Sequence, residues 1–214
     1  MENYTAIINE LITKDKYAEA LIYCGKALRE NPKNEDVINK AVFIFKRIQD
    51  AHLDLEPTNA EEYTLRGIAY FYIGEIDSSI HDYTKAIELD KNYDYAFKSR
   101  HIINFIMGNL STAENDIRRA IEINPIAEYY NDLGNVISSI SNSNFESLDC
   151  YLKAVQLEPQ IESFWYNYGC DLADKGQFEN AIEKLDKAIV LNPNYEDALF
   201  NRKCFIDHLR KLNK

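Results

Sequence analysis

The chain has 214 residues, of which 46% are hydrophobic and 28% are charged, and this composition excludes a disordered or fibrous protein. Seven glycines and five prolines are too few for an all-β protein rich in tight turns, or for glycine loops that bind phosphate. The net charge of −11 opposes nucleic-acid binding, because that affinity comes mainly from lysine and arginine.

The N-terminal residues and the cysteines predict a soluble, cytoplasmic protein. Residues 1–17 include three acids and lack a basic start followed by an apolar stretch, so we expect no secretory signal and a mature chain that begins at Met1. The longest apolar stretches, such as Ile68–Ile73, are too short for a membrane helix, which predicts no membrane association. Four widely separated cysteines without a Cys-x-x-Cys pair fit reduced thiols.

A period of 34 residues runs through the chain. Prolines recur on it at Pro57, Pro125, Pro159 and Pro193. Alanines recur on it at Ala86, Ala120, Ala154 and Ala188. Glycines recur on it at Gly74, Gly108 and Gly176. Because the three series share one period, the sequence indicates a repeat architecture.

Each full unit has the pattern of two amphipathic, antiparallel helices, with glycine between them and proline after them. The first clear helices are expected at Ala60–Ile73, Ile76–Leu89, Tyr95–Met107 and Leu110–Ile123. Glycine ends the first helix because it adopts the left-handed conformation at low cost, and proline cannot continue the second. Small residues at the helix contacts predict close approach, and the pairs are Gly67 with Ser79, Gly134 with Ser147, and Gly169 with Ala181.

These units resemble the tetratricopeptide repeat, whose 34-residue pattern contains an aromatic, Leu-Gly, Tyr, Ala, an aromatic, Ala and Pro. The unit 162–195 matches best, through Trp165, Tyr168, Gly169, Leu172, Ala181, Leu185, Ala188 and Pro193. The resemblance implies an all-α fold, a right-handed helical solenoid of antiparallel helix pairs with a C-terminal capping helix. We therefore expect a single solenoid over 1–214, with units at 1–34, 60–93, 94–127, 128–161 and 162–195, a truncated unit at 35–59, and the capping helix at 196–212.

The segment 35–59 departs from the period, because Pro32 and Pro57 are only 25 residues apart. An even number of helices keeps the next unit in the same orientation, so we expect a helix from about Glu35 to Lys46 and a shortened one ending near Leu55. A single long helix is the alternative, and the sequence leaves both open.

The last segment, 196–212, has the pattern of a first helix without a partner. Terminal units of solenoids usually cover the last apolar face, which favours a capping role. Self-association through this helix is the alternative, because several of its residues are apolar. They are Leu199, Phe205, Ile206, Leu209 and Leu212.

The resemblance also implies that the first helices line a concave groove in which a partner's peptide binds. One part of this groove is expected to be apolar, with Leu65, Ile68, Tyr72, Lys98, Ile102 and Ile106. The other part is expected to be polar, with Asn131, Asn135, Asn167 and Asn201. Amides donate and accept, so these asparagines are candidates for hydrogen bonds to a peptide backbone. Inter-repeat packing is the alternative role for the apolar residues.

The charge distribution indicates what such a partner contains. Residues 128–195 hold 11 acids and 4 bases, so we expect a protein or peptide with a hydrophobic anchor and basic residues. One subclass of the family grips chaperone tails with Lys, Asn and Arg on three consecutive first helices. Here Lys98 is followed by Ile102, Asp132 and Asn167, which disfavours that ligand.

No enzyme motif is present, so we expect no catalytic residue and no cofactor. Four residues of zinc-ligand type lie on neighbouring first helices, namely Cys170, Asp174, Cys204 and His208. We interpret them as groove and surface residues, with a metal site as the alternative. The sequence thus predicts a non-catalytic protein–protein interaction module, an adaptor, co-chaperone or assembly scaffold. The alternative is a self-associating structural element.

Overall fold

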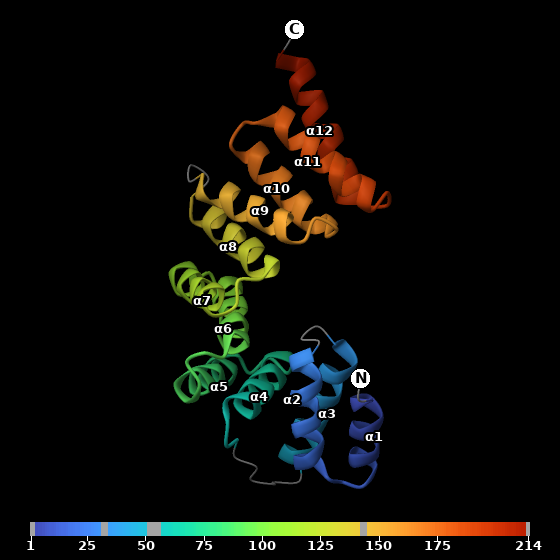
Figure 1. Ribbon diagram of the computed structural model, residues 1–214, viewed down its shortest axis with the longest axis vertical. Coiled ribbons are helices and arrows are strands. Elements are labelled where there is room, and N and C mark those ends of the chain that lie inside the picture. Colours follow the sequence, from blue (N-terminus) through green and yellow to red (C-terminus); the bar gives the residue numbers. More distant parts are fainter. Residues whose placement is uncertain (1–2, 31–33, 51–56, 142–144, 213–214) are drawn as a thin grey trace. The chain divides into compact units, whose positions relative to one another are not determined.

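The computed structural model describes residues 3–30, 34–50, 57–141 and 145–212, and the regular elements in these ranges are all α-helices (Figure 1). They are α1 (Tyr4–Thr13), α2 (Tyr17–Glu30), α3 (Glu35–Asp50), α4 (Ala60–Tyr72), α5 (Ile76–Leu89), α6 (Asp94–Ile106), α7 (Leu110–Ile123), α8 (Ala127–Ile140), α9 (Glu146–Leu157), α10 (Glu162–Asp174), α11 (Phe178–Leu191) and α12 (Glu196–Leu212). The expected all-α fold is confirmed. None of the described helices combines the length and apolar character needed to cross a bilayer.

The glycine series marks the turns within the helix pairs. Gly74, Gly108 and Gly176 have φ angles of 85°, 76° and 75°, in the left-handed region that glycine adopts most easily. α5 and α7 have the expected bounds, α4 ends one residue earlier than expected, and α6 begins and ends one residue earlier than expected. Asp15, which follows α1 as Gly74 follows α4, also has a positive φ of 54°. Aspartate tolerates this conformation better than most residues, so the first turn forms without glycine.

The chain forms two compact units, Met1–Ile103 and Asn104–Lys214, and the boundary between them falls near the end of α6. In the first unit α1 packs on α2, both α2 and α3 pack on α4, and α4 pairs with α5. In the second unit α8 pairs with α9 and α10 pairs with α11, while α7 packs on α8. α12 packs on α10 and α11, as expected of the capping helix. A single solenoid domain over 1–214 stays a prediction.

The first unit has a large hydrophobic cluster centred on α1 to α4, which includes Ile8, Val37 and Leu65. Gly25, the one glycine without a place in the repeat pattern, lies where α2 meets α4. A Cβ at this position would lie 3.3 Å from Leu65 Cδ1. The missing side chain therefore lets α2 pack closely against α4.

One helix, α3, begins the truncated segment and continues to Asp50, four residues past the expected end at Lys46. Residues 35–50 contain neither glycine nor proline, so nothing in the sequence stops the helix earlier. The expected shortened helix ending near Leu55 falls on residues 51–56, which lie outside the described residues.

Two of the three expected small-residue contacts are confirmed. Ser79 Oγ donates a 2.7 Å hydrogen bond to the carbonyl oxygen of Gly67. A Cβ at Gly169 would lie 3.1 Å from the carbonyl oxygen of Ala181. At Gly134 the ring of Tyr151 lies 2.7 Å from an added Cβ, as the ring of Tyr83 lies 2.6 Å from one at Gly67. Ser147, the expected partner of Gly134, donates a hydrogen bond to a carboxylate on α10.

Candidate functional site

Leu65 and Ile68, two of the expected groove residues, lie in the hydrophobic cluster of the first unit. They are 3% and 6% exposed, and they pack together with residues of α2 and α3. Both therefore have the position that the inter-repeat packing interpretation expects. A partner reaches neither side chain unless these helices separate.

The remaining residues of the expected apolar groove are divided between the units. Lys98 is buried in the first unit, whereas Tyr72 and Ile102 are exposed there. Ile106 is exposed in the second unit. Three of the six residues thus present a side chain to solvent, and their role in a groove stays a prediction.

Polar side chains of α8, α10 and α12 form a hydrogen-bonded row in the second unit. Asn167 Nδ2 on α10 donates to Asn131 Oδ1 on α8 at 3.0 Å. Asn201 Nδ2 on α12 donates to Tyr166 Oη on α10 at 3.1 Å. We call Asn131, Tyr166, Asn167 and Asn201 the amide row. It joins three successive first helices, as expected for a surface lined by such helices.

The amide row keeps unused hydrogen-bonding capacity. Asn167 and Asn201 are half-buried, and each acts as a donor. Within the described ranges their side-chain carbonyl oxygens accept no hydrogen bond. The Tyr166 phenol is protonated at neutral pH, as an ordinary tyrosine is, and burial raises its pKa further. The row therefore offers neutral acceptors and donors, the groups that recognise a peptide backbone.

Asn135 differs from the other three expected asparagines. Its Oδ1 accepts a 2.9 Å hydrogen bond from Tyr151 Oη on α9. This bond joins α8 to its paired helix rather than to the next first helix. The carbonyl group of Asn135 is therefore engaged within the pair.

A buried network around Asp171 supports the amide row, and the sequence analysis did not predict it. Asp171 accepts 2.6 Å hydrogen bonds from Ser138 Oγ on α8 and Ser147 Oγ on α9. Lys175 Nζ donates to the same carboxylate at 2.7 Å, and both charged side chains are at most 2% exposed. The sequence feature that could have indicated this network is the position of Asp171, an acid next to Leu172 in an otherwise apolar stretch of the helix. A satisfied polar network of this kind fixes α8, α9 and α10 to one another.

The structure does not gather the four residues considered as zinc ligands. Cys170 Sγ lies 3.5 Å from Asn201 Nδ2, and the ring centroids of His208 and Phe178 lie 4.3 Å apart. In the described part of the chain, no three His, Cys, Asp or Glu residues form a group suited to a metal ion. Burial also raises the pKa of the Cys170 thiol, which keeps it from the thiolate form that binds metals.

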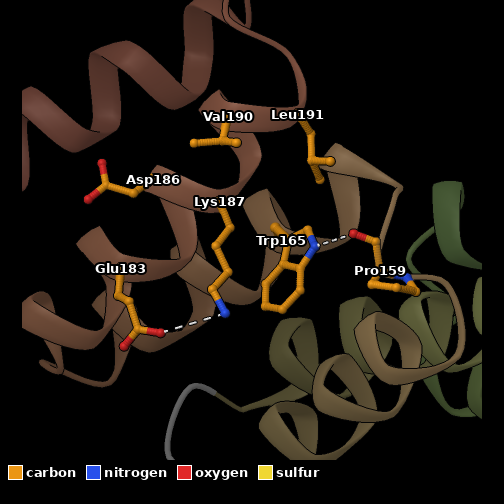
Figure 2. A pocket seen from close by; sticks show the side chains of 7 residues that line it. All are labelled: Pro159, Trp165, Glu183, Asp186, Lys187, Val190 and Leu191. Carbon is orange, nitrogen blue, oxygen red and sulfur yellow. Dashed lines mark hydrogen bonds and ion pairs between the residues drawn. The ribbon is translucent and has the colours of Figure 1, made fainter.

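A hollow of about 410 Å³ lies beside α10 and α11 (Figure 2). Its lining is mainly apolar, with three charged residues, and consists of Pro159, Trp165, Glu183, Asp186, Lys187, Val190 and Leu191. The sequence assigned Trp165 to repeat packing and gave no role to Val190. The sequence feature that could have indicated this surface is Val190, an apolar residue that occupies no position of the repeat pattern.

Two family models match the chain. A TPR repeat model matches residues 171–202, and a tetratricopeptide repeat model matches residues 60–93. The second match covers the helix pair α4 and α5, and the first covers the end of α10, all of α11 and the start of α12. These matches support the assignment of the chain to the tetratricopeptide repeat family.

Solved structures with the same fold include other tetratricopeptide repeat proteins. YrrB, described as a TPR protein with an unusual peptide-binding site, is 21% identical, with 94% of this chain and 90% of that chain covered and a TM-score of 0.62. MamA is 20% identical, with 92% of this chain and 98% of that chain covered and a TM-score of 0.57. At these identities the likeness shows the tetratricopeptide fold.

Curated relatives match shorter parts of this tetratricopeptide repeat chain. The Hsp70-Hsp90 organizing protein of Triticum aestivum is 27% identical over 93 residues, which cover 39% of this chain and 16% of that protein. The peroxisomal targeting signal receptor of Kluyveromyces lactis is 32% identical over 62 residues, which cover 28% of this chain and 11% of that protein. The matched part is thus a small fraction of either relative.

Proposed function

We propose that this tetratricopeptide repeat chain is a non-catalytic protein–protein interaction module that binds an extended peptide segment along the amide row. The observation that carries the proposal is the pair of carbonyl oxygens on Asn167 and Asn201. They are half-buried on neighbouring first helices and accept no hydrogen bond in the described residues. An extended peptide presents regularly spaced backbone N–H groups that such acceptors bind.

Charge and exposed apolar residues define the chemistry of the proposed partner. The excess of acids in residues 128–195 attracts a basic segment and raises its association rate. In the second unit, Ile106 is exposed and suits a hydrophobic anchor. A protein or peptide with hydrophobic and basic residues therefore fits this chain.

The relatives support a role in protein recognition. They include a receptor for a peroxisomal targeting signal and an organizing protein for Hsp70 and Hsp90, and YrrB has a peptide-binding site. By analogy, the role proposed here is that of a cytoplasmic adaptor, co-chaperone or assembly scaffold. Fold analogy alone does not assign the partner.

A displayed library of random peptides tests this function. Peptides selected on the wild-type chain should bind the Asn167→Ala/Asn201→Ala variant about 30-fold more weakly, because two hydrogen bonds of about 1 kcal/mol each are lost. The matched control is Asn180→Ala/Asn194→Ala, which removes two amides outside the row and should leave affinity unchanged. Equal affinity for all three proteins would refute binding along the row.

Self-association is the second candidate function, and one observation favours it. On α12, Leu199 is 43% exposed, Phe200 is 68% exposed and Leu212 is 66% exposed. Burying these side chains against another copy would remove apolar surface from water. Sedimentation should then depend on concentration for the wild type and lose this dependence in Phe200→Asp. A monomer at all concentrations would exclude this candidate.

A further inference from the structure

We propose that the hollow beside Trp165 is a second docking site, which takes an apolar side chain of a partner next to a lysine or arginine. Trp165 is the single tryptophan of the chain, and Val190 at the rim is 80% exposed. Burying tryptophan surface is a main source of binding energy at protein interfaces, and burying the exposed valine removes further apolar surface from water. The site is separate from the amide row and does not depend on the function proposed for that row.

The indole is held in a fixed position, which makes the hollow a preformed site. Trp165 Nε1 donates a 2.9 Å hydrogen bond to the carbonyl oxygen of Pro159. Lys187 Nζ lies 4.6 Å from the centroid of the indole ring, a cation–π contact. The indole also packs against two buried clusters of the second unit. A ligand would therefore lose entropy on binding while the protein loses little.

The two ends of the hollow differ in chemistry. In Figure 2, Glu183 and Asp186 lie on one side of Lys187, and Trp165 and Pro159 lie on the other. The lining thus offers an apolar end for a hydrophobic side chain and a carboxylate end for a cation.

The charge of the helices around the hollow indicates the charge of the partner. α10 and α11 together carry six acids and two bases, so the helices that form the hollow have an acidic balance. Glu183 is bonded to Lys184 at 2.9 Å, and Asp186 is paired with Arg202, but both carboxylates are about half exposed. Exposed ion pairs contribute little stability, so a partner's cation exchanges into them at small cost. A basic, apolar segment is therefore the occupant that complements this surface.

Trp165 fluorescence tests the proposal directly, because no other tryptophan contributes to the signal. The probe is a short synthetic peptide of alternating leucine and lysine, and the matched probe replaces lysine with glutamate. The leucine–lysine peptide should shift the emission to the blue with a saturable titration, since it excludes water from the indole. An unchanged emission, or equal affinity for the glutamate peptide, would overturn the proposal.

Three variants locate the peptide. Val190→Asp should weaken binding about tenfold, because it places a carboxylate at the apolar end. Leu157→Asp changes a residue on α9 that is 44% exposed and does not line the hollow, and it should bind as the wild type does. Asn167→Ala/Asn201→Ala should also bind normally. If Leu157→Asp weakens binding as much as Val190→Asp does, the peptide binds nonspecifically and the proposed site is wrong. If only the asparagine variant weakens it, the peptide occupies the amide row instead.

Discussion

Leu65 in the first unit and Asn167 in the second lie at the same place of the repeat, three periods apart, yet their surroundings differ. Leu65 packs against Gly25 of α2 in a hydrophobic cluster to which α3 also contributes. Asn167 is half-buried and bonds to an amide of α8. The repeat therefore sets the place of a residue on its helix. The neighbouring helices decide whether that place belongs to the core or to a surface.

The same difference in burial underlies the different roles that we propose for the two units. In the first unit α2 and α3 both pack on α4, so the first-helix side chains Leu65 and Ile68 stabilise the fold. In the second unit the corresponding place on α10 and α12 carries asparagine, with carbonyl groups left to accept hydrogen bonds. The proposed function therefore places ligand recognition in the second unit.

The largest effect on the free energy of unfolding is expected when a carboxylate replaces the side chain at the buried place, Leu65, rather than at the half-exposed place, Asn167. Leu65→Asp buries an unpaired carboxylate and should lower the free energy of unfolding by at least about 4 kcal/mol. Asn167→Asp, at the half-exposed place, should cost about 1 kcal/mol. Urea unfolding followed by circular dichroism measures both. Equal losses would show that the two places do not differ in burial.

The buried network of the second unit should give the next largest effect. Asp171→Ala leaves the ammonium group of Lys175 buried and unpaired, which should cost about 3 to 5 kcal/mol. The matched control Asp186→Ala breaks a pair of half-exposed residues and should cost less than about 1 kcal/mol. Similar unfolding midpoints for the two variants would contradict the role given to Asp171.

Close helix contact within the pairs predicts a smaller loss. Ala188 is fully buried between helices, and Ala188→Leu should cost about 1 to 3 kcal/mol through overpacking. Thermal unfolding measures this, with Val190→Leu on the exposed side of α11 as control. An unchanged melting temperature for Ala188→Leu would refute the contact.

Alkaline pH should weaken the buried cluster of the first unit. Burial raises the pKa of the Cys24 thiol from 9.0 to about 12, so the folded state keeps a proton that the unfolded state loses. This stabilisation is complete below pH 9 and is lost as the pH rises toward 12. The loss should reach about 1.4 kcal/mol near pH 10. It should disappear in Cys24→Ala and persist in Cys204→Ala, whose thiol is exposed.

The smallest effect on stability is expected at the exposed isoleucines. Ile102→Asp/Ile106→Asp should leave helicity unchanged, because both side chains are exposed. The variant should nevertheless lose partner capture if these residues supply the hydrophobic anchor. Capture at the wild-type level would remove them from the site.

Helix ends were predictable because glycine and proline mark them in the sequence. The bounds of α5, α7 and α12 agree with expectation to the residue. α3 was less predictable, since residues 35–50 contain no such marker and the helix continues to Asp50. Glycine and proline define a turn locally, whereas the length of a helix without these residues depends on its packing.

The candidate site was predictable in composition and not in detail. The sequence placed Asn131, Asn167 and Asn201 on first helices, and the structure adds that they form a row with Tyr166. The burial of Leu65 depends on α2 and α3, which the repeat pattern of its own unit does not contain. The hollow at Trp165 depends on which face of α11 stays uncovered, a property of packing across the pair.

Hydrogen–deuterium exchange with a library-selected peptide tests most directly the claim that ligand recognition lies in the second unit. The account predicts that bound peptide slows amide exchange in α8, α10 and α12 and leaves α2, α3 and α4 unchanged. Slower exchange confined to α2, α3 and α4 would contradict it, because the first unit would then be the recognition surface.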